Sequence, residues 1–308
     1  MSVRVIPPFL KPGDKIAIAA TARKVSYEEM KPAIEVFNNW GLEVITHPDL
    51  YKQYNQFAGT DECRAAVFQS YLDNEGVKAI VCARGGYGSV RMIDLLDWSS
   101  FNKQPKWVIG YSDVTVLHSH IHKHTNVCSL HATMPINMRQ PEANVLSISA
   151  MHKVLFGQDH STSISPHSLN RSGTAKGELI GGNLSVLFSL LGSNSDIDTK
   201  GKILFLEDLD EYLYHIDRMM QALKRAGKLT HLAGLIVGGM TDMKDNTIPF
   251  GKTAEEIIRE TVNEFNYPIC FNYPSGHQDI NLPLVFGKQY QLSFSHNKFE
   301  LAVLSKSV

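Results

Sequence analysis

The amino-acid sequence predicts an α/β protein with a parallel-sheet N-terminal domain and a smaller, mixed α/β C-terminal domain. In the first half of the 308 residues, short apolar runs alternate with segments of helical periodicity, which is typical of βαβ units around a parallel sheet. The second half mixes expected strands and helices less regularly. The length corresponds to two domains of about 150 residues. A chain of this size buries enough apolar surface to fold without a metal or a disulfide.

Apolar runs in the first half predict buried strands, and the segments between them have the spacing of helices. The expected strands are 15–20, 42–46, 77–83 and 107–110. The expected helices are 27–40, 64–74, 90–96 and 114–124. Because a helix follows each strand, we expect successive strands to lie parallel in one sheet.

A polar segment separates the two expected domains. Residues 157–173 are rich in Ser, His, Asn and Pro and contain few large apolar residues, which is typical of a linker. We therefore expect an N-terminal domain at 1–156, a C-terminal domain at 174–308, and an active crevice between them. Patterns in the C-terminal half predict helices at 179–191, 213–226 and 253–265, strands at 202–206, 232–238 and 269–272, and a hairpin at 290–303.

Composition and charge exclude several classes of protein. Lys and Arg number 30 against 31 Asp and Glu, so the basic excess of a nucleic-acid-binding protein is missing. No stretch approaches the roughly 18 consecutive apolar residues of a membrane span. Pro7, Pro8 and Lys11 interrupt the place where a secretion signal needs an apolar core. The 4 cysteines form no CxxC motif, which predicts buried free thiols in a reducing compartment, the cytoplasm.

The most informative segment is the passage from the expected strand 107–110 into the following helix. It reads Gly-Tyr-Ser-Asp at 110–113. A sharp strand-to-helix turn can present a serine hydroxyl with the next backbone N–H free to bind an oxyanion. Val114 stands where the nucleophile-elbow motif G-x-S-x-G has its second glycine. The residues alone leave two interpretations open: Ser112 is a nucleophile, or Ser112 or Asp113 is the N-cap of the helix.

A serine nucleophile needs a base and an orienting acid, and two residues that follow expected strands are candidates. Glu207 comes directly after an apolar run, and His277 lies in the loop after the strand 269–272. Open α/β folds present ligand groups at such strand ends. Each residue also has an ordinary interpretation, because a surface acid often begins a loop and a single loop histidine is usually solvated.

A glycine-rich turn at 83–88 resembles a dinucleotide fingerprint without matching it. The fingerprint would require a further glycine where Arg91 stands. Gly85 and Gly86 instead suggest backbone that approaches a substrate closely, with an N–H that can serve as an oxyanion donor. We therefore expect no nucleotide cofactor.

The histidine run at 118–124 resembles a metal site. On a helix these histidines form i,i+4 pairs on two different faces. A zinc site would need a third ligand, and neither pair encloses the glutamate of an H-E-x-x-H motif. We expect a solvated or half-buried helix and no metal.

Taken together, these segments resemble the LD-carboxypeptidase family of serine peptidases, which includes the microcin-immunity hydrolases. The resemblance runs nearly end to end and rests on eight short segments in the family's order. They are residues 10–16, 57–61, 83–88, 110–113, 177–184, 206–208, 216–218 and 276–277.

The resemblance implies a flavodoxin-like N-terminal domain and a C-terminal domain of the swivelling β/β/α type. It also implies a catalytic triad across the domain interface, with Ser112 from the first domain and Glu207 and His277 from the second. The backbone N–H groups of Gly86 and Asp113 would form the oxyanion hole. This favours the nucleophile over the cap at Ser112. Such proteins are typically cytoplasmic homodimers without metal or cofactor.

The function implied is hydrolysis of the bond before the terminal D-alanine of muropeptide tetrapeptides during cell-wall recycling. A carboxypeptidase must bind a free carboxylate, and Arg84 and Arg218 are the candidates because a guanidinium can hold a carboxylate bidentately. Either arginine can equally belong to a structural ion pair. The chain departs from the family pattern in two loops, at 20–22, where a Pro-Ser pair is common, and at 282–287.

Two alternatives stay open. The first is hydrolysis of peptidyl-adenylate analogues, as in the microcin-immunity branch, which carries a tryptophan in a C-domain loop. Here every tryptophan precedes residue 108, although Tyr212, Tyr214 or Phe250 can stack on a base instead. The second alternative is a peptide-binding relative without catalysis, against which an intact triad argues.

Overall fold

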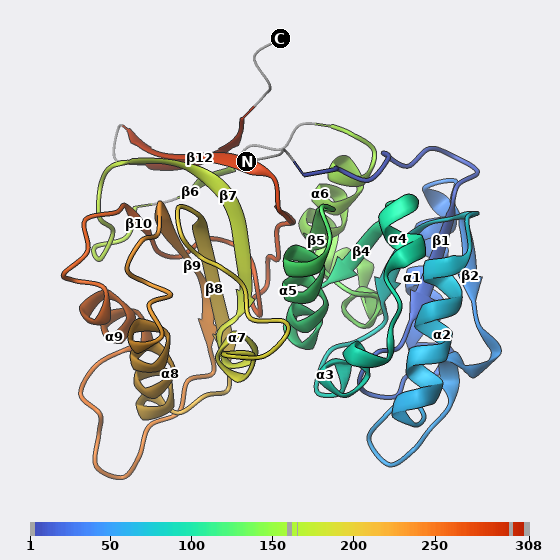
Figure 1. The fold of residues 1–308 in the computed structure, drawn as a ribbon, viewed down its shortest axis with the longest axis horizontal. Helices are drawn as coiled ribbons and strands as arrows, with labels where there is room; N and C mark the ends of the chain where they lie inside the picture. Colours follow the sequence, from blue (N-terminus) through green and yellow to red (C-terminus); the bar gives the residue numbers. More distant parts are fainter. Residues whose placement is uncertain (1–3, 159–161, 165, 296–297, 305–308) are drawn as a thin grey trace.

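Two β-sheets with their helices make up the molecule in a computed structural model that describes residues 4–158, 162–164, 166–295 and 298–304 (Figure 1). The first sheet has six strands in the order β11-β5-β4-β3-β1-β2. Strands β1 to β5 pair in parallel, and their order is that of flavodoxin-like folds. The strands are β1 (Lys15–Ala19), β2 (Glu43–Thr46), β3 (Val77–Cys82), β4 (Trp107–Gly110), β5 (Ser129–His131) and β11 (Leu284–Phe286).

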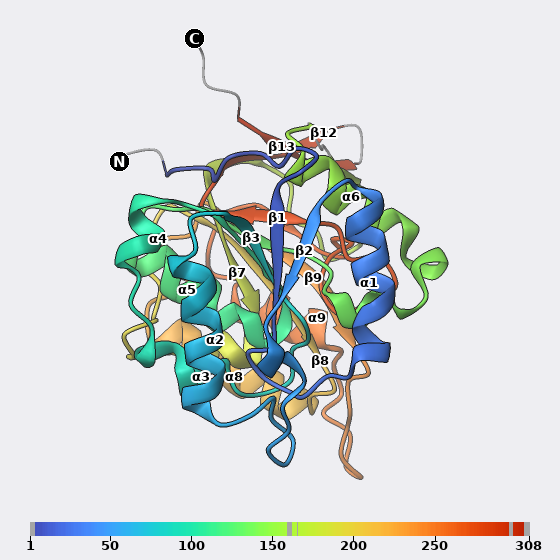
Figure 2. The same ribbon diagram turned by 90° about the vertical axis from the view of Figure 1, so that its right-hand side faces the viewer.

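Helices cover both faces of this sheet, as expected for βαβ units (Figure 2). α1 (Tyr27–Asn39) and α6 (Val145–Leu155) pack on one face, and α2 (Asp61–Asp73) and α5 (Thr115–His124) pack on the other. α1 begins at Ser26 with a capping box. The shorter helices of this half are η1 (Pro48–Tyr51), α3 (Ser89–Met92), η2 (Ile93–Leu95), α4 (Ser99–Lys103), η3 (Ser112–Val114), η4 (Pro135–Arg139) and η5 (Pro141–Asn144).

The second sheet is mixed and has seven strands in the order β10-β9-β8-β7-β12-β13-β6. Strands β7 to β10 are parallel, and β12, β13 and β6 pair antiparallel. Its strands are β6 (Thr162–Ile164), β7 (Thr174–Asn183), β8 (Ile203–Leu209), β9 (Gly234–Thr241), β10 (Ile269–Cys270), β12 (Gln289–Ser295) and β13 (Lys298–Val303). Helices α7 (Leu184–Ser189), α8 (Leu213–Arg225) and α9 (Ala254–Thr261) pack on one face. The architecture confirms the predicted fold class.

The chain passes from the first sheet to the second within the expected linker, and it returns to the first sheet after His277. β6 lies inside the segment 157–173 and pairs with β13 of the second sheet. β11, from the C-terminal half, pairs antiparallel with β5 of the first sheet. Residues after His277 therefore return to the N-terminal sheet, which ties the loop that carries this histidine to both halves of the molecule.

The predicted helix at 179–191 is wrong over its first part. Residues up to Asn183 belong to β7, which pairs in parallel with β8, and only Leu184–Ser189 is helical. Gly181 and Gly182 have φ of +135° and +141°, which no helix contains. A short apolar run with glycines is compatible with a buried parallel strand as well as a helix, and periodicity alone does not separate them.

The histidine-rich helix α5 is an interface helix and not the solvated or half-buried helix that the sequence predicted. It packs against β7 and α7 of the other half, and His118, His120 and His122 are buried. Each has a polar neighbour: His118 contacts Ser129 Oγ and the Gly110 carbonyl at 2.8 Å, His120 contacts Ser195 Oγ at 3.0 Å, and His122 Nε2 contacts Arg4 Nη2 at 3.2 Å. Burial lowers the pKa of His118 and of His120 to about 4. Among the described residues, no three His, Cys, Asp or Glu side chains are placed to hold a metal ion.

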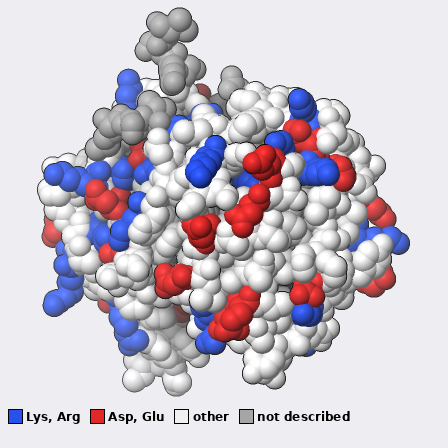
Figure 3. All heavy atoms as spheres, turned by 45° about the vertical axis from the view of Figure 1, so that its right-hand side comes forward, with Lys and Arg blue, Asp and Glu red and all other residues white. Residues whose placement is uncertain are grey.

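The distribution of charge on the surface and the lengths of the described helices agree with the near-neutral charge and the lack of long apolar stretches in the sequence. Lys and Arg are interspersed with Asp and Glu on the face drawn in Figure 3. No helix in the described part of the chain is long and apolar enough to cross a membrane. All four cysteines are free thiols, and Cys82, Cys128 and Cys270 are buried.

One close contact joins the halves where α5 begins. The N–H of Asn183 donates to Thr115 Oγ1 at 3.0 Å. A Cβ on Gly182 would overlap this hydroxyl and lie 2.7 Å from Thr115 Cγ2. Glycine at 182 is therefore required both by its φ and by the approach of α5.

We expect Gly182→Ala to lower the free energy of unfolding by about 1–3 kcal/mol more than Gly192→Ala, measured by urea denaturation. Gly192 is the matched control, because its φ is also positive (+76°) but no atom lies within 4 Å of an added Cβ. Adding Thr115→Ala to Gly182→Ala should recover part of the loss. Equal losses for the two glycine variants would contradict the packing argument.

Candidate active site

A cleft of about 460 Å³ opens between the two sheets. Its size lies in the range of small-molecule sites, and it lies at the carboxyl ends of parallel strands, as ligand sites of open α/β sheets do. The first sheet supplies the loops after β1, β3 and β4, and the second supplies the ends of β7 and β8. The lining residues are Arg23, Arg84, Gly85, Gly86, Tyr111, Ser112, Asp113, Met134, Ile136, Asn183, Ser185, Val186, Leu209, Asp210, Glu211 and His277.

Ser112 occupies a strained turn between β4 and α5. Its φ is +64°, in the left-handed region that costs energy for a residue with a side chain and that recurs at functional sites. The alternative N-cap interpretation is wrong, because no side chain caps this helix start. Asp113 Oδ2 instead accepts the N–H of Ser89 at 2.8 Å, which ties the turn to α3.

The glycine-rich loop after β3 approaches Ser112 closely. A Cβ on Gly85 would lie 2.9 Å from Ser112 Oγ, and Gly86 has φ +111°. Within the described chain the Gly86 N–H has no hydrogen-bond acceptor. The Asp113 N–H lies in the first turn of a helix, where amides lack an intrahelical acceptor. Two backbone donors thus lie at the cleft beside the hydroxyl.

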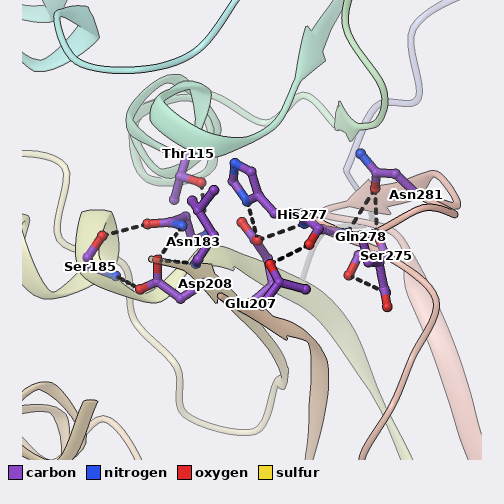
Figure 4. Close-up of polar contacts among 12 residues, drawn as sticks. Thr115, Asn183, Ser185, Glu207, Asp208, Ser275, His277, Gln278 and Asn281 are labelled. Carbon is purple, nitrogen blue, oxygen red and sulfur yellow. Dashed lines mark hydrogen bonds and ion pairs between the residues drawn. The ribbon is translucent and has the colours of Figure 1, made fainter. Parts of the chain in front are cut away.

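Glu207, near the end of β8, contacts His277 in the loop after β10 (Figure 4). Glu207 Oε2 contacts His277 Nδ1 at 2.7 Å and accepts the backbone N–H of His277 at 3.2 Å. Gly276, with φ +102°, makes this possible, because a Cβ there would lie 2.7 Å from Glu207 Cβ. The Gly276 N–H donates to Asn281 Oδ1 at 2.9 Å, which holds the turn.

The surroundings of His277 favour its charged form. Burial disfavours the imidazolium, but the charge and the hydrogen bond of Glu207 outweigh it, so the pKa of His277 is raised above its ordinary value. Glu207 itself has no solvent exposure. The centres of the Tyr111 ring and the His277 imidazole lie 4.7 Å apart. Among the described residues no hydrogen bond joins Ser112 to His277, although both line the cleft.

A second buried carboxylate, Asp208, lies behind the cleft lining directly after Glu207, and the sequence did not single it out. Figure 4 shows Glu207 directed to His277 and Asp208 directed to the other side. Asp208 accepts from Asn183 Nδ2 and from the Ser185 N–H, both at 2.9 Å. Burial and the neighbouring Glu207 charge raise the pKa of Asp208 to about 7. Its position directly after Glu207 was the available signal.

The candidate arginines separate in space. Arg84 lines the cleft, and its Nη1 lies 3.7 Å from Glu29 Oε1. Arg218 lies on α8 over the Tyr214 ring, 5.1 Å from its centre, and is not among the residues that line the cleft. Arg23, which the sequence did not single out, lines the cleft as well. It lies in the loop after β1, beside the residues that depart from the family pattern, and this departure was its signal.

Comparison with known proteins gives consistent matches over both halves. Residues 16–132 match the LD-carboxypeptidase N-terminal domain, and residues 176–292 match the LD-carboxypeptidase C-terminal domain. A probable murein peptide carboxypeptidase of Bacillus subtilis is 33% identical over 93% of this chain and 91% of its own length. The murein tetrapeptide carboxypeptidase of Pseudomonas aeruginosa is 26% identical over 89% of this chain and 91% of its own length.

Solved structures agree with these matches. The muramoyltetrapeptide carboxypeptidase of Oxalobacter formigenes has a TM-score of 0.86 and 26% identity, over 94% of this chain and 99% of its own. The microcin C7 self-immunity protein MccF has a TM-score of 0.85 and 20% identity, over 99% of each chain. At that identity the second match shows a shared fold.

The contact between Glu207 and His277 predicts a measurable titration. Because the carboxylate raises the pKa of His277, Glu207→Gln should move this pKa downward, as followed by NMR of the imidazole protons. Glu211→Gln is the matched control: Glu211 also lines the cleft but pairs with His215 at 2.6 Å, so it should leave the His277 pKa nearly unchanged. A His277 pKa that stays constant in Glu207→Gln would refute the pairing.

Proposed function

This chain belongs to the LD-carboxypeptidase family of serine peptidases, and we propose that it removes the terminal D-alanine from muropeptide tetrapeptides in cell-wall recycling. We assign Ser112 as the nucleophile, His277 as the base and Glu207 as the orienting acid. The observation that carries the assignment is the 2.7 Å contact of a fully buried Glu207 with His277, in a cleft that also contains a strained serine.

The reaction follows from these groups. His277 Nε2 accepts the proton of Ser112 Oγ, which attacks the carbonyl carbon before the terminal residue. Glu207 keeps the Nδ1 proton in place and stabilises the imidazolium. The imidazolium then protonates the leaving amine of D-alanine, and water hydrolyses the acyl-enzyme by the reverse use of the same base. In the apo form the Ser112–His277 hydrogen bond need not be formed, because catalytic contacts often tighten only around substrate.

The N–H groups of Gly86 and Asp113 are our candidates for the oxyanion hole. The observations that support them are the close approach of Gly85 to Ser112 and a Gly86 N–H that has no acceptor among the residues the structure describes. A single donor of this kind is worth about 2.7–4 kcal/mol in the transition state. No metal or cofactor enters the steps proposed here.

A peptidyl-adenylate hydrolase is the second candidate, since MccF shares the fold. The two curated relatives described above, at 33% and 26% identity, carry carboxypeptidase names, whereas MccF is 20% identical. Tyr212 and Tyr214 pack against each other, with ring centres 5.6 Å apart and ring planes tilted by 36°. Neither of them nor Phe250 is among the residues that line the cleft. This arrangement supports the peptide substrate over one with a nucleobase. A peptide-binding relative without catalysis is disfavoured by the paired Glu207 and His277.

We also propose that the enzyme works in the cytoplasm as a homodimer, with 1–156 and 174–308 as its two domains joined by 157–173. The free cysteines support a reducing compartment. The homodimer rests on the resemblance to the family. The substrate is a small peptide, and neither nucleic acid nor a membrane has a part in the reaction.

The nucleophile can be tested with a tetrapeptide that ends in D-alanine. Ser112→Ala should lower the kcat of D-alanine release by about 10⁴-fold or more, because loss of a triad nucleophile leaves only binding and the oxyanion donors. Ser189→Ala is the control: this serine lies on α7 with its hydroxyl bonded to the Val186 carbonyl, and it should keep the normal rate. Wild-type turnover by Ser112→Ala would exclude Ser112 as nucleophile.

Double variants test whether the three groups act together. If they form one unit, Ser112→Ala/His277→Ala and His277→Ala/Glu207→Ala should be scarcely slower than the worst single variant. Independent groups would give multiplied losses in kcat. The assay is again D-alanine release at saturating tetrapeptide.

A further inference from the structure

Arg23 is a cation in the cleft for which the described part of the chain provides no acidic partner. Arg84 lies 3.7 Å from a Glu29 oxygen, and Arg218 lies outside the cleft. Arg23 takes part in no ion pair among the described residues, and its side chain is exposed to solvent. A free guanidinium in a substrate cleft is suited to a carboxylate of the substrate, which it can bind bidentately.

Backbone hydrogen bonds of the residues before and after Arg23 fix the position of its main chain, and therefore of its Cα and Cβ atoms. The Lys24 N–H donates to the Gln56 carbonyl at 3.0 Å, and the Ala58 N–H donates to the Ala22 carbonyl at 3.1 Å. Arg23 itself forms an isolated bridge with Phe57. The loop after β1 is therefore anchored to 56–58.

The Arg23 side chain lies over the loop that we assign to the oxyanion. An added Cβ on Gly86 would lie 2.7 Å from Arg23 Cγ and Cδ and 2.8 Å from Nε. Successive carbonyl carbons of an extended peptide are separated by one residue, at most about 3.6 Å along the chain. A carboxylate one residue beyond a carbonyl bound at Gly86 is thus within reach of the Arg23 guanidinium.

We propose that Arg23 binds the terminal carboxylate of the substrate and thereby restricts hydrolysis to the last residue of the peptide. The proposal rests on the proposed carboxypeptidase function and deepens it. A longer C-terminal extension would place an uncharged amide at this guanidinium and its carboxylate elsewhere. Arg23 is then the residue that makes the enzyme an exopeptidase.

The opposite wall of the cleft agrees with this orientation of the peptide. Asp210 and Glu211 line that side, and ionised carboxylates offer no hydrogen-bond donor to a terminal carboxylate. Asp210 pairs with Lys244 at 2.6 Å and Glu211 with His215 at 2.6 Å. The terminal carboxylate is therefore expected on the Arg23 wall, above the Gly86 loop.

The test compares the tetrapeptide with its C-terminal amide. Arg23→Gln should lower kcat/KM for the free acid by about 10- to 100-fold, mainly through KM. It should leave kcat/KM for the amide, measured as release of D-alaninamide, nearly unchanged. Arg23→Lys should recover part of the preference for the acid, because it keeps the charge but loses the bidentate geometry.

Two variants serve as controls. Lys24→Gln removes the same charge at the neighbouring residue, which is outside the cleft lining and contacts Gln53 at 3.3 Å, and it should change the acid/amide ratio less than threefold. Arg84→Gln should also retain the ratio. The proposal would be overturned if Arg23→Gln left the acid/amide ratio of kcat/KM unchanged, whether both values stayed the same or fell equally. It would also be overturned if only Arg84→Gln abolished the preference for the acid.

Binding measurements distinguish a failure of the proposed role of Arg23 from a failure of the proposed reaction. In the Ser112→Ala background, calorimetry should show tighter binding of the free acid than of the amide, and Arg23→Gln should abolish that difference. If the wild-type protein releases no D-alanine but this difference appears and disappears as described, the reaction fails and the role of Arg23 stands. If D-alanine is released but the difference is absent, the reaction stands and the role of Arg23 fails.

Discussion

The buried carboxylate of Glu207 is the constraint on which the site depends. A carboxylate without solvent exposure is tolerated only with hydrogen-bonding partners, and here one oxygen contacts both the ring and the backbone of His277. That double contact requires Gly276 at a positive φ, and it orients the imidazole with its second nitrogen free. The end of β8, the loop after β10 and the base are therefore parts of one arrangement.

The site depends equally on the contact between the two sheets, because the proposed nucleophile and its base lie on opposite sides of that contact. Asn183 ends β7, donates its N–H to Thr115 on α5, and donates its side-chain amide to Asp208. Asp208 follows Glu207 directly, so the strand that carries the acid is linked to the helix that follows Ser112. Gly182 allows α5 to approach to this distance. The histidine run of α5 is buried by the same approach.

The charged residues of the cleft are divided between its two walls, which supports the proposed binding of a peptide C-terminus. Arg23 and Arg84 lie on the wall formed by the first sheet, and Asp210 and Glu211 on the other. Under the proposed role of Arg23, this division places the terminal carboxylate of the peptide on the wall of the first sheet, beside the Gly86 loop. The loop after β1 departs at 20–22 from the Pro-Ser pair that is common in the family, and the same loop carries Arg23.

Local features of the sequence predicted the α/β class, the parallel pairing of strands in the first half, and Ser112, Glu207 and His277 as candidates. Strand ends and short segments in family order can be recognised without knowledge of long-range contacts. The end of β7 could not be predicted from the sequence, because an apolar run with glycines is as compatible with a helix as with a strand. The three-dimensional structure was needed to reveal the burial of His118, His120 and His122, the contacts of Asp208, and the position of Arg23 in the cleft with Arg218 outside it. Each of these depends on which residues from distant parts of the chain meet across the two sheets, and no local pattern contains that information.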